Sequence, residues 1–444
     1  MNNRIGRWCA AAAVLALTAA LPAMAAKTCD VKKYGAKGDG TTKDTAVFQK
    51  AIDDCAQGKG GGTVEVPAGT YLLAPILLKS NMTLHLAKDA ILMGSPDHAD
   101  YPVIQEFRQD GHQALVSAVS AENISITGEG VIDGNGDSWW HAMRGGPAAA
   151  APSATPLNVN NGANVPGSGI AAGQAARPRL VVFDHCKNVL MTGVTVRNSP
   201  FWQIVPYYSD HVTFRNIRVT ATLPSPNTDA IDPFSSSNVI IDHVYVDTGD
   251  DDVAIKSGLA NSPGGDEPSK NITITDCVFD HGHGVSIGSE IAGGAQNIRV
   301  ERVKFTGTDN VIRIKAARDR GADVSNIVFK DITMDGVKNP ILITEYYPRA
   351  GTLAEVPAMP VTRLTPMFHD ITIENVTATN SGNSGSIVGL PESPVLNLTL
   401  KNVNISGKTG MLIAYSKVTT DGLTVKADTG DSLQIAPTAT VTKK

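Results

Sequence analysis

The 444-residue chain is poor in aromatic residues, in metal-ligand patterns and in helical periodicity. Aromatic side chains make up only 5% of it, which fits a narrow core filled by Val, Ile and Leu. No CxxC pair or His/Cys cluster has the spacing of a structural zinc site, so we expect no metal. After residue 56 no segment repeats apolar residues at helical spacing, which excludes a β/α barrel with a helix after each strand.

Long apolar runs are missing too, apart from one near the N-terminus. Residues 1–25 combine Arg4 and Arg7, an apolar run over positions 9–21 and a small-residue cleavage site, as secretory signal peptides do. The run is too short to span a bilayer. We therefore expect the protein to be secreted to the extracellular space, and to pass through the periplasm if the cell is Gram-negative. Cleavage would change the net charge from −5 to −7 (−5 − 2).

Cysteine is scarce, and four cysteines remain once the predicted signal peptide is removed. Cys29 and Cys55 flank the first helix candidate, and an oxidising destination allows them to pair in a disulfide. Cys186 and Cys277 lie within strand patterns and are equally compatible with buried thiols, since free cysteine packs as a small hydrophobe.

One amphipathic helix is predicted, over Asp44–Ala56, after a glycine-rich turn at residues 34–40. Asp44 or Thr42 can cap its start. Its apolar face carries Val47, Phe48, Ala51, Ile52 and Cys55. Because this helix is alone, it suits a lid over the open end of a solenoid core.

The remainder repeats one unit of two short strands joined by a polar bend. The units include NISITGEGVIDG from Asn123, NVLMTGVTVRNS from Asn188, NVIIDHVYVDTG from Asn238 and NITITDCVFDHG from Asn271. Their alternating apolar residues predict a parallel β-helix of about ten coils. A propeller would need blades of about 40 residues with four strands each. The leading Asn residues fit the turn into each strand and can stack on the Asn one coil away.

We expect one all-β domain over residues 26–444. Residues 144–179, rich in Ala, Pro, Gly and Asn, are predicted to form a long flexible loop. Trp139 and Trp140 precede this loop. They are equally compatible with a pair that stacks on a sugar and with packing at the base of the loop.

Three acids recur at the spacing of one coil. Asp229 and Asp250 are 21 residues apart (250 − 229), so they are expected on neighbouring rungs about 4.8 Å apart, with Asp251 beside them. Breaking a glycosidic bond needs one carboxylic acid and one carboxylate. Like charges at such a distance raise at least one pKa, which keeps one acid protonated. A calcium site is the rival interpretation.

Cations and a histidine follow on later coils. In the alternating run Val311–Lys315, Arg313 and Lys315 must share the outward face, so they can bind a sugar carboxylate and moderate the pKa values of the acids. Lys256, on the strand after the acids, is expected to add to them. His283 lies between two glycines and is expected to be accessible.

With these motifs in this order, the chain resembles the polygalacturonases of glycoside hydrolase family 28. The resemblance rests on Asn227-Thr228-Asp229, Gly249-Asp250-Asp251, Gly282-His283-Gly284 and Arg313-Ile314-Lys315, with Tyr347 at the family's substrate-stacking position. It extends from the turn at residue 34 to about the last coil and is nearest to bacterial secreted endo-acting enzymes. Asp252 and Ala230 depart from the family's common residues.

The resemblance implies a right-handed parallel β-helix and inverting hydrolysis of α-1,4-linked galacturonate in homogalacturonan. Asp250 would be the general acid, Asp229 and Asp251 would activate water, and His283 would support them. Asn227, Lys256, Arg313, Lys315 and Tyr347 would bind substrate. We expect pectin as partner, no cofactor, no nucleic acid, no membrane after cleavage, and a monomer.

Other functions stay open. Exo action or a substituted pectin substrate would keep the same chemistry. A calcium-dependent pectate lyase would release unsaturated ends and stop with a chelator. A noncatalytic β-helix binding protein would not turn over at all.

Overall fold

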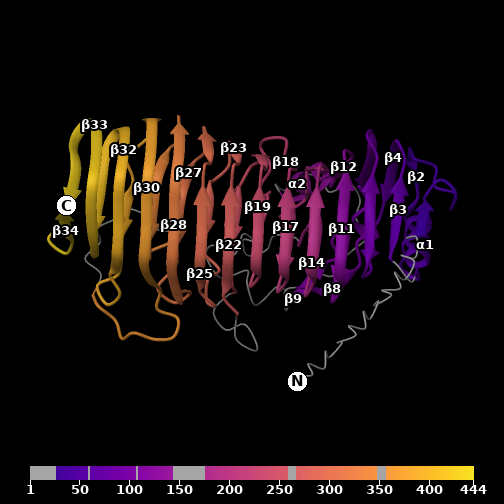
Figure 1. The fold of residues 1–444 in the computed structure, drawn as a ribbon, viewed down its shortest axis with the longest axis horizontal. Coiled ribbons are helices and arrows are strands. Elements are labelled where there is room, and N and C mark those ends of the chain that lie inside the picture. Colours follow the sequence, from indigo (N-terminus) through magenta and orange to yellow (C-terminus); the bar gives the residue numbers. More distant parts are fainter. Residues whose placement is uncertain (1–26, 59–60, 107–108, 144–175, 259–266, 348–356) are drawn as a thin grey trace, which may run out of the picture.

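The computed structural model describes residues 27–58, 61–106, 109–143, 176–258, 267–347 and 357–444. The predicted signal peptide lies outside the described residues, as does most of the predicted loop. The described chain winds into a right-handed parallel β-helix whose coils stack along one long axis (Figure 1). The fold class predicted from the repeats is therefore confirmed.

Each coil contributes up to three short strands, so the strands form three parallel stacks. The first, here called the ladder stack, takes the first strand of each coil. Its members are β1 Lys27–Asp30, β3 Gly62–Val66, β6 Met82–Leu86, β11 Glu122–Gly128, β14 Lys187–Thr192, β17 Asp210–Arg215, β19 Ser237–Asp242, β22 Ser269–Thr275, β25 Ala295–Glu301, β28 Asp323–Asp335, β30 Met367–Ser381, β32 Val395–Ala414, β33 Ser416–Ile435 and β34 Thr440–Lys443.

The second stack follows each bend. It contains β2 Asp39–Lys43, β4 Gly69–Leu73, β7 Ala90–Gly94, β12 Val131–Asp133, β15 Thr195–Arg197, β18 Arg218–Thr220, β20 Tyr245–Asp247, β23 Val278–Asp280 and β26 Lys304–Thr306, and it continues into the second half of β28. These strands are short because the polar bends on either side end them.

The third stack, here called the site stack, carries the remaining strands. They are β5 Ile76–Leu78, β10 Val116–Val119, β13 Val181–Asp184, β16 Ile204–Tyr207, β21 Val253–Ile255, β24 Val285–Ile287, β27 Asn310–Lys315, β29 Asn339–Thr344 and β31 Ser386–Val388. Between β16 and β21 the chain pairs through isolated bridges at Ile231 and Phe234.

Alternation turns every second residue of each strand into the interior, where equivalent apolar residues of successive rungs stack. The register of the ladder stack aligns a buried column that runs through Val64, Leu84, Ile126, Met191, Phe214, Ile241, Ile274, Val300, Phe329, Ile373 and Leu400. Because adjacent rungs bury the same face, a shift of register by one residue would expose every member of the column.

The N-terminal end is closed by α1 Thr45–Ala56, which packs against β1, β3 and β5 (Figure 1). Phe48, Ala51 and Ile52 are buried on its inner face as predicted. Asp44 is the N-cap residue, but its carboxylate accepts hydrogen bonds from the backbone of the preceding turn and none from the helix. The structure joins Cys29 of β1 to Cys55 of α1 in a disulfide, with their Cα atoms 5.9 Å apart.

Short elements leave the coils near the middle of the helix. The 3-10 helix η1 His98–Asp100 and the antiparallel pair β8 Val103–Glu106 and β9 Gln109–His112 lie between β7 and β10, and α2 Asp137–Met143 follows β12. The sequence did not predict α2. Trp139 and Trp140 of α2 are both buried, which favours the packing interpretation over an exposed sugar-stacking pair.

Three further features of the sequence can be compared with the described residues. Cys186 and Cys277 are buried free thiols. At the end of the predicted 144–179 loop, Arg177 and Arg179 are buried, so this end belongs to the packed scaffold. Among the residues described, no helix combines the length and apolarity needed to cross a membrane.

Candidate active site

The candidate site occupies the turns that lead into successive strands of the site stack. Ile231 pairs with Val253, and Val253 pairs with Val285. Asp229, Asp251 and His283 each precede one of these paired residues by two positions. The register therefore places the three side chains on adjacent rungs, at steps of about 4.8 Å.

Asp251 is surrounded by donors. Its Oδ1 accepts hydrogen bonds from Ser286 Oγ at 2.7 Å and Arg313 Nη1 at 2.8 Å, and its Oδ2 accepts one from Lys315 Nζ at 3.0 Å. Burial raises the pKa of Asp251, but the cations Lys315 and Arg313 outweigh burial and hold it well below its usual range. Asp251 is thus a carboxylate across the physiological pH range.

Arg313 and Lys315 do share one face, as the alternation predicted, while Ile312 and Ile314 are fully buried. Both cations are themselves largely buried and are already paired with Asp251. The ring of Tyr347 lies 5.8 Å from Arg313 Cζ and 5.3 Å from Lys315 Nζ, so the tyrosine joins the same cluster.

Asp250 pairs with His283. Asp250 Oδ1 accepts hydrogen bonds from the backbone N–H of Asp251 at 2.9 Å and is 3.0 Å from His283 Nδ1. Burial raises the pKa of Asp250, yet the hydrogen bond and charge of His283 bring it below its ordinary value. Conversely, burial lowers the pKa of His283, and the Asp250 carboxylate raises it above its ordinary value.

Asp229 is buried like Asp251 but has fewer cations beside it. Burial raises its pKa well above the ordinary value, and the nearby charges of Asp250 and Asp232 raise it further. Its ion-pair partner is Lys256, whose Nζ is 3.5 Å away. In the free protein the raised carboxyl pKa therefore belongs to Asp229 and the lowered one to Asp250, the reverse of the order that the resemblance implies.

Lys256 is as buried as Lys315, but it pairs with a different set of acids. Its Nζ lies 3.3 Å from Glu290 Oε2, 4.0 Å from Asp232 Oδ2 and 4.6 Å from the centroid of the Trp202 ring. These contacts place Lys256 among the acids, and its role in substrate binding stays a prediction.

The third consecutive acid, Asp252, has a different hydrogen-bond partner from the other two. It is fully buried, and its Oδ2 accepts a hydrogen bond from Gly284 N–H at 2.8 Å. Gly282 has a φ of 89°, and a Cβ there would lie 2.6 Å from Asp252 Oδ1. Only glycine fits that turn, which explains the first glycine beside His283.

The sequence interpretation missed several residues of this site. Asp232 and Glu290 contact Lys256, Trp202 covers it, and Arg177 contacts Asn227. Asn227 itself was predicted to bind substrate, but its amide lies between Arg177 and Asp250. Ser286 pairs with Arg313 in the register of β24 and β27, so its place beside Arg313 could have been inferred from the coil spacing.

In the part of the chain that the structure describes, two clusters have the ligand types of a metal site. Asp250, Asp251 and His283 hold ligand atoms within 4.8 Å of one another, but Arg313 and Lys315 already neutralise Asp251. Asp242, His243 and Asp276 form the second cluster, where Arg215 and Arg302 pair with the carboxylates. Both donor sets suit internal ion pairs better than a divalent cation, which needs free carboxylate oxygens.

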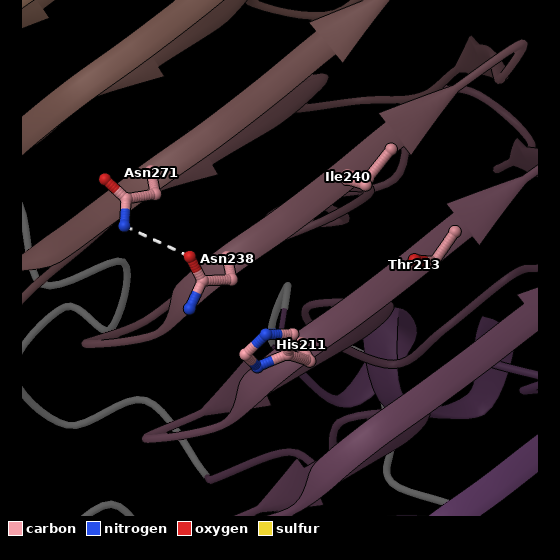
Figure 2. Close-up of a pocket in the computed structure, with 5 residues that line it drawn as sticks. All are labelled: His211, Thr213, Asn238, Ile240 and Asn271. Atoms are coloured by element: carbon pink, nitrogen blue, oxygen red, sulfur yellow. Dashed lines mark hydrogen bonds between the residues drawn. The ribbon is translucent and has the colours of Figure 1, made fainter. Parts of the chain in front are cut away.

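A pocket of about 280 Å³ lies away from these acids, on the ladder stack (Figure 2). It is lined by His211, Thr213, Asn238, Ile240 and Asn271 from β17, β19 and β22. The Asn271 amide donates to Asn238 Oδ1 across its floor at 3.1 Å. The pocket carries no acid pair, so it is not a hydrolytic centre.

A parallel β-helix that gathers carboxylates, an imidazole and cations on adjacent rungs has the equipment of a glycoside hydrolase. Glycosyl hydrolases family 28 matches residues 156–424, and the family described as rhamnogalacturonase A/epimerase, pectate lyase-like, matches residues 28–135. The chain belongs to glycosyl hydrolases family 28.

Its relatives include both endo-acting and exo-acting enzymes. The chain is 31% identical to an endo-polygalacturonase of Pectobacterium carotovorum subsp. carotovorum over 83% of this chain and 86% of the relative. It is 29% identical to an exo-poly-alpha-D-galacturonosidase of Dickeya chrysanthemi over 93% and 76%. The exopolygalacturonase of Thermotoga maritima superposes with a TM-score of 0.75 at 27% identity, covering 93% and 92%.

Proposed function

We propose that this protein hydrolyses the α-1,4-galacturonosidic bonds of polygalacturonate by attack within the chain. The observation that carries the proposal is the pairing of two differently held acids: Asp251 is neutralised by two cations, and Asp250 is hydrogen-bonded to His283. The similarity to an endo-polygalacturonase over most of the chain supports the substrate and the endo mode. Exo action and a substituted pectin remain the alternatives.

Asp250 is proposed as the general acid. A bound galacturonate carboxylate would bring a further negative charge beside Asp250 and raise its pKa, so that the acid holds a proton for the departing glycosidic oxygen. After transfer, His283 stabilises the Asp250 carboxylate through Oδ1. The lowered pKa of Asp250 in the free protein means that its ionised form is favoured there. This is the form that Asp250 has after it has given its proton to the leaving oxygen.

Asp229 and Asp251 are proposed to activate water. Asp251 is held ionised by its two cations, while Asp229 must lose its proton before it can accept one from water, and Lys256 favours that loss. Water then adds its hydroxyl to the anomeric carbon as the bond to the leaving oxygen breaks. This single displacement inverts the anomeric configuration.

Product analysis on unesterified polygalacturonate tests the function. We expect reducing ends to appear together with a steep early loss of viscosity, because internal cuts shorten chains fastest. Monomer release with little loss of viscosity would establish the exo mode instead. Unsaturated, ultraviolet-absorbing ends that no longer form when a chelator is added would show a lyase reaction instead of hydrolysis. Binding of the polymer without any products would show a noncatalytic binding module.

The roles of the acids can be separated with an activated leaving group. A nitrophenyl glycoside of a galacturonate oligomer needs little protonation to depart. Asp250→Asn should therefore recover most of its activity on this substrate, and Asp229→Asn should not. The opposite pattern would make Asp229 the acid, in line with its raised pKa.

The secreted location and the monomeric state are parts of the same proposal. Cleavage after residue 25 would be detected by N-terminal sequencing of the protein recovered from culture medium. An intact N-terminus, or a mass in solution above that of one chain, would contradict the corresponding part.

A further inference from the structure

Arg177 is a buried cation beside the proposed acids that the sequence interpretation did not identify. Its Nη1 donates to the backbone carbonyls of Pro200 and Pro226, both at 2.9 Å, and its Nη2 donates to Asn227 Oδ1 at 2.7 Å. The guanidinium also lies 4.8 Å from the Phe201 ring centroid. Burial lowers the pKa of Arg177 to about 10, against the attraction of Asp229 and Asp250.

The register explains how Arg177 reaches Asn227. Val181 pairs with Ile204, and Ile204 pairs with Ile231. Arg177, Pro200 and Asn227 precede these paired residues by four positions each, so they occupy equivalent places on three consecutive rungs. An arginine side chain is long enough to pass the proline rung, two steps of about 4.8 Å from the asparagine rung. Its planar fork contacts acceptors on both rungs on the way.

This contact determines which way the Asn227 amide faces. A guanidinium has only donors, so the amide atom 2.7 Å from Arg177 must be the oxygen. The NH₂ group then occupies the other branch, where Asn227 Nδ2 lies 3.4 Å from Asp250 Oδ2. Without Arg177 the amide would be free to turn its oxygen toward the carboxylate.

The two oxygens of Asp250 therefore have different surroundings. Oδ1 receives the Asp251 N–H and faces His283 Nδ1, so its lone pairs are used. Within the described ranges, the hydrogen-bond partner of Oδ2 is the Asn227 NH₂ group, which leaves this oxygen a lone pair for a proton. The proton that a general acid delivers belongs on this oxygen, and the amide helps to define its position.

We infer that Arg177 is a positioning residue for the proposed general acid: it holds the Asn227 amide with its NH₂ group toward Asp250 Oδ2. The inference rests on the proposed function. It predicts that Arg177 acts through Asn227, and that a cation of different shape cannot replace it.

A double-mutant cycle tests this dependence. The variants are Arg177→Lys, which keeps the charge but loses the fork, Asn227→Gly, and both together. Glycine accepts the φ of 56° at position 227 without strain. We expect each single change to lower kcat on the order of ten- to a hundredfold with KM within about twofold. The double variant should be no slower than Asn227→Gly alone.

Asn238→Gly is the matched control, because Asn238 has a φ of 54° but lies on the ladder stack. It should leave kcat unchanged. If Arg177→Lys lowers kcat equally in the presence and absence of the Asn227 side chain, Arg177 acts independently and the inference is wrong. A fall in melting temperature without any change in kcat would show a structural role only and would overturn it as well.

A second readout does not depend on turnover. The imidazole of His283 can be titrated by NMR in the same four proteins. Loss of the donor to Asp250 Oδ2 should make Asp250 a stronger acceptor and move the His283 midpoint upward in both single variants, with no further shift in the double variant. Unmoved midpoints would refute the inference. An inactive wild type with shifted midpoints would refute only the proposed function.

Discussion

The ladder stack and the site stack use the same coil geometry for opposite purposes. On the ladder stack an Asn at positive φ opens many coils, and its amide donates to the Asn one coil back: Asn123 to Asn81, Asn188 to Asn123, Asn271 to Asn238, Asn297 to Asn271 and Asn326 to Asn297. On the site stack the turns carry Asp229, Asp251 and His283, and the following strand β27 carries Arg313 and Lys315.

This difference between the two stacks shows that the effect of stacking in a solenoid depends on which groups are stacked. Identical neutral groups satisfy one another on every rung and stabilise the stack. Unlike charged groups at the same spacing shift one another's pKa values, and the oxygens of Asp232 have no hydrogen-bond partner among the residues described, although Oδ2 lies 4.0 Å from Lys256 Nζ. We therefore expect the charged turns of the site stack to stabilise the fold less than the neutral rungs of the ladder stack.

The largest effect is expected from Asp250→Asn. Loss of the acid should lower kcat on polygalacturonate by about a thousandfold or more, because proton transfer to the leaving oxygen is lost. Asp210→Asn makes the same chemical change on the ladder stack and should leave kcat unchanged. Equal losses in both variants would abolish the functional contrast between the stacks; kinetics and circular dichroism would be measured together.

Removing one buried cation should strongly affect stability. Lys315→Met leaves Asp251 with one cation fewer and should lower the free energy of unfolding by about 3 kcal/mol near pH 7. Because the pKa of Asp251 is lowered in the folded state, the stability it contributes is present above its unfolded pKa of about 3.9 and is lost as pH falls below that value. The difference from wild type should shrink accordingly in urea titrations at low pH.

The control for this prediction is Lys401→Met, which breaks an exposed pair with Glu374 in the last rungs of the ladder stack. An exposed pair contributes little, so we expect no measurable change in stability. If both lysine variants behave alike, burial does not distinguish the two stacks.

A smaller, pH-dependent effect is expected from His283→Gln. The pKa of His283 is raised in the folded state, so its stabilising contribution is complete below its unfolded pKa of about 6.5 and fades as pH rises through the folded value. The stability difference between wild type and variant should therefore be larger at pH 6 than at pH 9. A difference that grows with pH would contradict the pairing with Asp250.

The smallest effect is expected on the ladder stack itself. Asn238→Gly removes a donor to Asp210 and an acceptor for Asn271, and should lower the free energy of unfolding by about 1–2 kcal/mol. Hydrolysis should be unaffected. A loss of activity without loss of stability would give the pocket of Figure 2 a part in turnover.

Much of the architecture could be predicted because it depends on local patterns. Alternating apolar residues set the strands, the repeat length set the coil, and the lone amphipathic helix at Asp44–Ala56 indicated the cap. The same repeat length placed Asp229 near Asp250 and Asp251, because residues one coil apart must be neighbours. The helix α2 escaped prediction because seven residues are too few for a periodic signal.

The amino-acid sequence by itself determined the β-helix and the rungs that carry the acids, since both follow from spacing along the chain. Only the tertiary structure decided that Lys256 pairs with Asp229, that Asp252 accepts a hydrogen bond from Gly284, and that Arg177 reaches across two rungs to Asn227. It also decided which carboxyl pKa is raised. Side-chain direction at irregular turns and the electrostatic field of buried charges depend on contacts between coils, and no local periodicity encodes them.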